Sequence, residues 1–235
     1  MLRMTVNDNA AGAKSYYTDG LSREDYYSEG QEVAGVWQGR GAEKLGLSGR
    51  VEKADFESLC DNRNPRSGGN LTPRTKDNRR VGYDFNFHAP KSVSIHYALT
   101  GDRRIMDAFQ RAVRETMVEM ERDAKGRVRK KGQRGDRPTG NLVWAEFVHL
   151  TARPVGGVPD PHLHAHAFTF NATWDQEEGV WKAGEFGTIK KRAPYFEAAF
   201  HARLAGQLAR EGFAIERHGK GWELGGIPRS LVQKF

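Results

Sequence analysis

The chain has 235 residues, a formal net charge of +7 and one cysteine. A single cysteine excludes an internal disulfide, no apolar run approaches the roughly 20 residues of a membrane span, and the first residues lack the apolar core of a signal peptide. We therefore expect a cytoplasmic protein in which Cys60 is a small buried residue rather than a nucleophile. The positive charge favours a polyanionic partner such as nucleic acid.

Two tyrosine pairs, Tyr16-Tyr17 and Tyr26-Tyr27, stand out near the start of the chain. They lie among short helical signals that cover residues 10–17, 24–27, 41–45 and 53–60. In such a pair one ring usually packs against the protein while its neighbour faces water. These tyrosines therefore need support from elsewhere in the sequence before a function is assigned to them.

Two segments are strongly basic. The first, residues 62–80, is most often a solvated loop, but in a DNA-binding protein it is a ribbon or loop that lies along a groove. The second, residues 125–137, has seven basic residues and one acidic residue, and we interpret it as a mobile loop that contacts phosphates. The basic residues of the first segment are Arg63, Arg66, Arg74, Lys76, Arg79 and Arg80.

Residues 81–88 alternate between apolar and polar side chains, which predicts a strand. Three aromatic rings share one face of it, and Asp84, Asn86 and His88 share the other. Pro90 then begins a predicted helix to about residue 99, and Asp102 is the predicted N-cap of the next helix. That helix has an apolar stripe for the core, made by Ile105, Phe109, Ala112, Val113, Thr116 and Met120.

The most informative stretch is residues 160–168, in which His162, His164 and His166 alternate. On a strand all three imidazoles share one face, but the outer two are roughly 13 Å apart, too far for one metal ion with nitrogen ligands at about 2.1 Å. A pair of them therefore needs a third ligand from a neighbouring strand. Residues 141–153 also alternate as a strand, and a hairpin between the two strands places His149 beside that pair.

The remainder predicts a short strand at residues 179–181, a helix from Pro194 to residue 210 that ends before Gly212, a hairpin of residues 213–216 and 222–224, and a final helix from residue 228. This last helix runs to the end of the chain, so we expect a fragment of a longer protein. One α+β domain built on an antiparallel sheet is the economical architecture.

Several motifs occur in an order that is specific for one family. They are SYYTDG followed by DYY, WQGRGAEKLGLSG, GYDFNFHAPKSVS, GNLVWAEFVHLTAR and DPHLHAHAF. Together they resemble the relaxase domain of the MobF class of conjugative relaxases, the TrwC and TraI type. The resemblance implies that residues 1–235 form a relaxase domain with a central antiparallel sheet flanked by helices, the palm of HUH endonucleases.

The resemblance also implies a function. It predicts a nickase of the origin of transfer that acts in conjugation and plasmid mobilisation. A tyrosine attacks the scissile phosphate of single-stranded DNA beside a hairpin, leaving a 5′-phosphotyrosine intermediate that permits rejoining. By position in the motifs, His149, His164 and His166 correspond to the metal ligands and Asp84 to the neighbouring acid. The first nucleophile is Tyr16 and the second is Tyr26.

Other residues receive lesser roles from the resemblance. Tyr17 and Tyr27 are helpers or substitutes, while Arg74, Lys76 and Arg153 are DNA contacts. His162 is left as a neighbour or alternative ligand, and His88 stands where a small hydroxyl residue is more usual. The implied partners, besides DNA, are relaxosome accessory proteins and a coupling protein, and the chain is expected to be a monomer in the donor cytoplasm.

One divalent ion is expected, with Mg²⁺, Mn²⁺, Zn²⁺, Ni²⁺ and Co²⁺ all candidates. Three alternatives stay open at this point: a rolling-circle replication initiator with the same chemistry, a metallohydrolase that does not act on nucleic acid, and a DNA-binding module with a structural metal. The tyrosine pairs upstream of the histidines favour the relaxase over the initiator.

Overall fold

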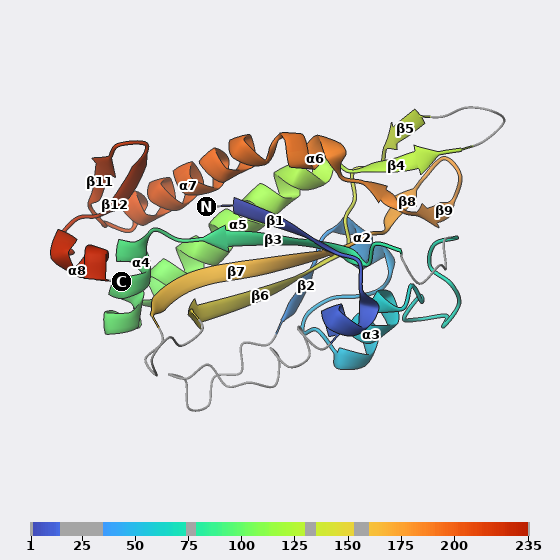
Figure 1. Cartoon of the computed structure of the whole chain (residues 1–235), viewed down its shortest axis with the longest axis horizontal. Coiled ribbons are helices and arrows are strands. Elements are labelled where there is room, and N and C mark those ends of the chain that lie inside the picture. Colours follow the sequence, from blue (N-terminus) through green and yellow to red (C-terminus); the bar gives the residue numbers. More distant parts are fainter. Residues whose placement is uncertain (1, 15–34, 74–78, 130–134, 153–159, 235) are drawn as a thin grey trace.

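The computed structural model describes residues 2–14, 35–73, 79–129, 135–152 and 160–234. Its centre is a five-stranded sheet in the order β1-β3-β7-β6-β2, in which each neighbouring pair is antiparallel (Figure 1). The predicted α+β architecture is therefore confirmed. The five strands are β1 (Leu2–Asn7), β2 (Val36–Gln38), β3 (Gly82–His88), β6 (Trp144–Thr151) and β7 (Pro161–Phe170).

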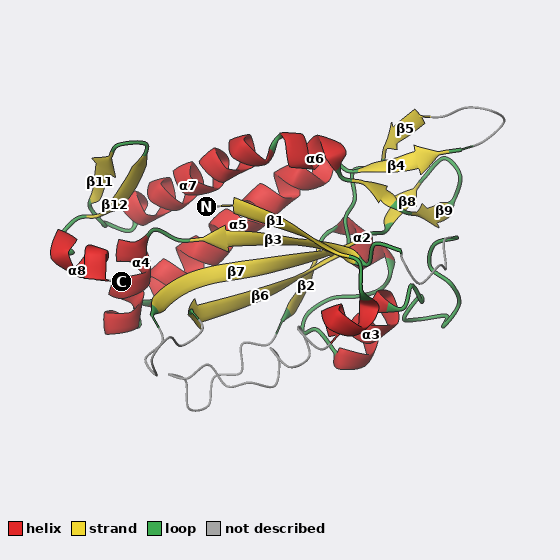
Figure 2. Cartoon of the chain, viewed as in Figure 1, coloured by secondary structure: helices red, strands yellow, loops and turns green. Residues whose placement is uncertain are grey.

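Two long helices, α5 (Arg103–Arg122) and α7 (Ala193–Arg210), cover one face of this sheet (Figure 2). The stripe predicted for α5 is buried along its whole length, from Ile105 to Met120. As predicted, the Asp102 carboxylate caps this helix by accepting a hydrogen bond from the Arg104 amide at 3.0 Å. The helical period of apolar residues thus decides which side of α5 meets the sheet.

The other face is covered at one end by α3 (Lys53–Cys60), which has the predicted bounds, and by α2 (Arg40–Lys44). Phe56 of α3 is the centre of this second apolar cluster, and its ring lies 5.4 Å from that of Phe168 and 5.1 Å from that of Phe170, between centroids. Cys60 is fully buried in the same cluster, and burial raises the pKa of its thiol to about 12. It is therefore a packing residue, as expected.

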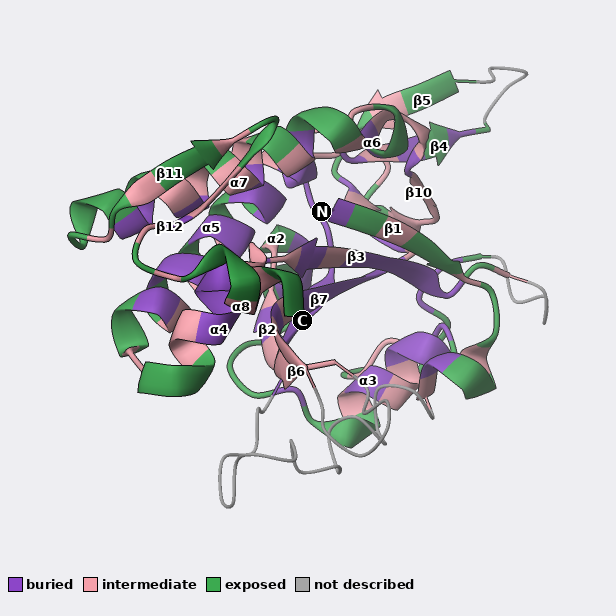
Figure 3. Ribbon diagram, turned by 60° about the vertical axis from the view of Figure 1, so that its left-hand side comes forward, coloured by how far each residue is buried: buried purple, intermediate pink, exposed green. Residues whose placement is uncertain are grey.

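Strand β7 divides its side chains between these two faces. Leu163, Ala165 and Ala167 are buried toward the long helices, whereas His164 and His166 lie on the opposite face. Strand β3 does the same, with its three aromatic rings toward the helices. Figure 3 shows β3 as a buried strand beside the more exposed edge strand β1. The alternation in the sequence therefore predicts the face of each side chain correctly.

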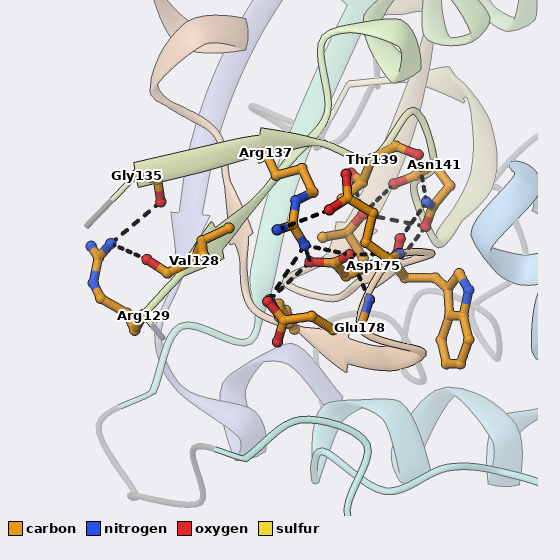
Figure 4. Close-up of polar contacts among 12 residues, drawn as sticks. Val128, Arg129, Gly135, Arg137, Thr139, Asn141, Asp175 and Glu178 are labelled. Atoms are coloured by element: carbon orange, nitrogen blue, oxygen red, sulfur yellow. Dashed lines mark hydrogen bonds and ion pairs between the residues drawn. The ribbon is translucent and has the colours of Figure 1, made fainter. Parts of the chain in front are cut away.

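One basic segment differs from its prediction. Residues 125–137 are not simply a loop, because β4 (Lys125–Val128) pairs with β5 (Gly135–Pro138). Arg137 of β5 is also not available for phosphates, since it contacts both carboxylate oxygens of the buried Asp175 at 2.8 and 3.0 Å (Figure 4). The physical reason is that a buried carboxylate needs cationic and hydrogen-bonding partners, which Arg137 and Lys182 supply.

The remaining elements are short except for α4. They are α4 (Lys91–Thr100), β8 (Thr173–Asp175), β9 (Val180–Lys182), β10 (Gly184–Glu185), α6 (Gly187–Lys191), β11 (Ile215–His218), β12 (Gly221–Leu224) and α8 (Arg229–Lys234). The helix expected at residues 10–17 is seen over residues 10–14. None of the helices in the described ranges is long and apolar enough to cross a membrane.

Candidate functional site

Five of the histidines form a cross on the sheet face opposite the long helices. His164 is at its centre, directly opposite His88 of β3 on one side and His149 of β6 on the other. His162 and His166 lie along β7 on either side of His164. We call this group the histidine cross. Antiparallel pairing produces it, because residues opposite one another in register share a face.

The three predicted metal ligands are mutual neighbours within the cross. Their ring centroids are 5.2 Å apart for His149 and His164, 5.3 Å for His149 and His166, and 5.2 Å for His164 and His166. The rings of His149 and His164 are nearly parallel at 27°, while that of His166 is steeply inclined to both. The expected hairpin therefore brings together one predicted ligand from β6 and two from β7.

These donor atoms do not already surround a single point. In the described part of the chain, no group of three or more His, Cys, Asp or Glu side chains has the geometry of a metal site. A metal ion held by all three imidazoles therefore requires rotation of these side chains. Such rotation leaves the backbone of the strands unchanged.

Hydrogen bonds determine which nitrogen carries the proton in two of these rings. The Nδ1 atom of His164 lies 2.8 Å from the backbone oxygen of His162, and that of His166 lies 2.7 Å from Oδ2 of Asp84. Both partners can only accept, so each Nδ1 carries the donated proton. In the neutral rings the unprotonated nitrogen is then Nε2, and Asp84 orients the ring of His166.

Asp84 is almost fully buried, with 5% of its surface exposed. Besides His166, the amide of Asn86 donates to its Oδ2 at 3.3 Å. Its other oxygen, Oδ1, is buried and has no hydrogen-bond partner among the described residues. A buried acceptor without a donor is costly, so Oδ1 is the atom of this carboxylate best suited to receive a proton or a hydroxyl hydrogen from a further group.

Burial keeps several of these rings neutral. It lowers the pKa of His164 to about 2 and that of His88 to about 3, and it also lowers the pKa of His162. The charged form of an imidazole loses its hydration in such a site, whereas the neutral form loses much less. Each of these rings therefore keeps one unprotonated nitrogen at neutral pH, and the neutral imidazole is the form that binds metals.

The structure adds one contact that the sequence did not predict. Nδ1 of His88 lies 2.9 Å from Nε2 of His162, in rings inclined by only 13°. The alternation of Asp84, Asn86 and His88 on one face of β3 was the signal that could have indicated it. Arg3 of the unpredicted edge strand β1 lies opposite Asn86 and extends this polar face.

Several predicted residues lie outside the described parts of the chain, and their predicted roles remain predictions. They are Tyr16, Tyr17, Tyr26, Tyr27, Arg74, Lys76 and Arg153. Of the predicted site residues, the structure thus brings together His149, His164, His166 and Asp84, on three neighbouring strands.

Comparison with known proteins gives a consistent set of relatives. The family model of the TrwC relaxase matches residues 10–235. The multifunctional conjugation protein TraI of Escherichia coli (strain K12) is 38% identical over 243 residues, which cover 97% of this chain and 13% of that protein. A second TraI from Escherichia coli is 37% identical with the same coverage. The chain therefore spans about an eighth of the length of these curated relatives.

Two solved structures are similar over the whole chain. A metal-bound structure of the conjugative relaxase TrwC in complex with oriT DNA has a TM-score of 0.86 and 36% identity, covering 100% of this chain and 79% of that one. A TrwC complex with a 27-mer DNA that comprises the recognition hairpin and the cleavage site has a TM-score of 0.86 and 32% identity, covering 100% and 78%.

Proposed function

Because the chain belongs to the TrwC relaxase family, we propose that it nicks one DNA strand at a plasmid's transfer origin and later rejoins it. The observation that carries the proposal is the placement of His149, His164 and His166 beside Asp84 on one face of the sheet. That set combines metal-binding nitrogens with a buried carboxylate. It suits the transfer of a phosphoryl group.

His149, His164 and His166 are the residues proposed to hold one divalent ion. When bound, such an ion neutralises charge on phosphate oxygens and fixes the orientation of the phosphate. Neutral imidazoles suit Zn²⁺, Mn²⁺, Ni²⁺ or Co²⁺, and the harder Mg²⁺ remains a candidate at high concentration. The hydrogen bond that His166 Nδ1 donates to Asp84 orients that ring and leaves Nε2 as its unprotonated nitrogen.

The proposed chemical step is a transesterification. The hydroxyl oxygen of Tyr16 forms a bond to phosphorus, and the bond from phosphorus to the 3′ oxygen breaks with its electron pair. An unperturbed tyrosine has a pKa of about 10, so the hydroxyl needs a base. We assign that role to the unpartnered Oδ1 of Asp84, and the proton finally leaves on the 3′ hydroxyl. One phosphodiester replaces another, which makes the step reversible.

The other expected roles belong to the same proposal. Tyr26 performs the second cleavage that ends transfer, and Tyr17 and Tyr27 are the helpers or substitutes. Arg74, Lys76 and Arg153 contact single-stranded DNA and its adjacent hairpin. The chain acts as a monomer in the donor cytoplasm together with accessory and coupling proteins, as the relaxase domain of a longer protein.

A covalent-adduct assay tests this function. The protein is incubated with single-stranded oligonucleotides that carry candidate transfer origins, with Mg²⁺ or Mn²⁺, and separated on a denaturing gel. We expect a DNA–protein adduct whose rate falls about 1000-fold in Tyr16→Phe, because the nucleophilic oxygen is lost. Tyr195→Phe, a change of an exposed tyrosine on α7, is the matched control. Folded, metal-loaded protein that forms no adduct with any of these substrates would contradict the proposal.

A further inference from the structure

The histidine cross contains two rings that the proposed function does not use, His88 and His162. They come from different strands, β3 and β7, and both are half-buried on the face that carries the three proposed ligands. The ring of His162 is 4.6 Å from that of His164, and the ring of His88 is 5.8 Å from it. Any group bound by these two rings would therefore adjoin the three-histidine site.

We propose that His88 and His162 form a second metal-binding pair, which holds a second divalent ion beside the one assigned to the three histidines. Nδ1 of His88 and Nε2 of His162 are 2.9 Å apart. Two nitrogens that bind one tetrahedral ion at about 2.1 Å are roughly 3.4 Å apart. The pair therefore needs to open by only a few tenths of an ångström, which side-chain rotation provides.

The proton in the hydrogen bond between His88 and His162 can move when a metal ion binds. Two neutral imidazoles that face each other share one proton, so one nitrogen donates and the other accepts. On metal binding, the donating ring moves this proton through solvent to its other nitrogen. Both facing nitrogens then offer a lone pair, and the pair releases no net proton.

The surrounding charges indicate a weaker site than the first one. Near His162, the negative charge of Asp160 attracts a cation, whereas the positive charge of Lys91 repels one. Arg3 likewise opposes a positive charge at His88. Only two protein ligands are available, so water or a phosphate oxygen of DNA must complete the coordination. We therefore expect binding at least about 10-fold weaker than at the three histidines.

Metal stoichiometry tests the inference without any measurement of activity. The protein is dialysed against increasing Ni²⁺ and the bound metal is determined by elemental analysis, with circular dichroism as the check of folding. We expect wild type to saturate at two ions per chain and both His88→Ser and His162→Gln to saturate at one. His218→Gln, a change of a histidine on the β11–β12 hairpin, is the matched control and should keep two.

A fourth variant separates the two sites. His166→Ala should lose the tighter ion and keep the weaker one, because His166 belongs only to the first site. A wild-type chain that binds one ion, lost in His166→Ala and kept in His88→Ser, would overturn the second site and leave the proposed nicking function intact. Retention of two ions in both His88→Ser and His162→Gln would also overturn it.

Discussion

The two faces of the central sheet are built from the same strands but differ in their side chains and in what covers them. The face toward α5 and α7 is a continuous apolar core, whereas the opposite face is apolar beneath α2 and α3 and carries the histidine cross at its other end. Adjacent residues of β7 therefore have different tasks: Ala165 packs, and His164 and His166 offer nitrogens. A strand places alternate residues on opposite faces, so packing on one face can hold a polar constellation rigid on the other.

The strongest test of this division is a large-to-small change on the helix-covered face. Phe109 of α5 is fully buried, so Phe109→Ala should lower the free energy of unfolding by about 3–5 kcal/mol. Metal affinity should remain close to that of wild type at temperatures where the variant is folded. Urea denaturation and Ni²⁺ titration measure the two quantities. Val118→Ala, at an exposed position of the same helix, is the control and should change neither by much.

The converse change on the histidine face should affect metal more than stability. Asp84→Asn replaces the carboxylate that orients His166 by a neutral, weaker acceptor, so we expect metal affinity to fall about 10–100-fold. The control is Asp107→Asn, which alters an exposed carboxylate on α5. Unchanged affinity in Asp84→Asn would mean that the His166–Asp84 contact does not support a metal ligand.

Acidification should lower the free energy of unfolding by a smaller amount, through buried histidines on both faces of the sheet. Burial lowers the pKa of His164 to about 2 and that of His201, on α7, to about 4. Below about pH 6.5 these two histidines bind protons in the unfolded chain but not in the folded one. The free energy of unfolding therefore falls as the pH falls. We expect each of these two rings to cost metal-free protein on the order of 1 kcal/mol per pH unit between pH 6 and 4.5.

Denaturation with a chelator at several pH values measures this slope. His201→Gln and His164→Gln should each reduce it, because each removes one group that titrates only in the unfolded state in this range. A slope that is unchanged in both variants would contradict the assignment of the acid sensitivity to these buried rings.

Much of the fold could be predicted because its signals are local. The α5 stripe, its Asp102 cap and the bounds of α3 follow from residues a few positions apart. The edge strands β1 and β2 were missed for the opposite reason. Each is short or only partly apolar, and each becomes a strand by pairing with a partner far away in the sequence, as Leu2 pairs with Phe87.

The sequence by itself determined the chemistry of the site: alternating histidines on β7, a further histidine on the preceding strand and a polar face on β3. Only the tertiary structure decided how these groups meet, including the Asp84–His166 hydrogen bond and the contact between His88 and His162. The physical reason is register. Alternation assigns a residue to a face, but the pairing of strands that are remote in sequence decides which residues on that face become neighbours.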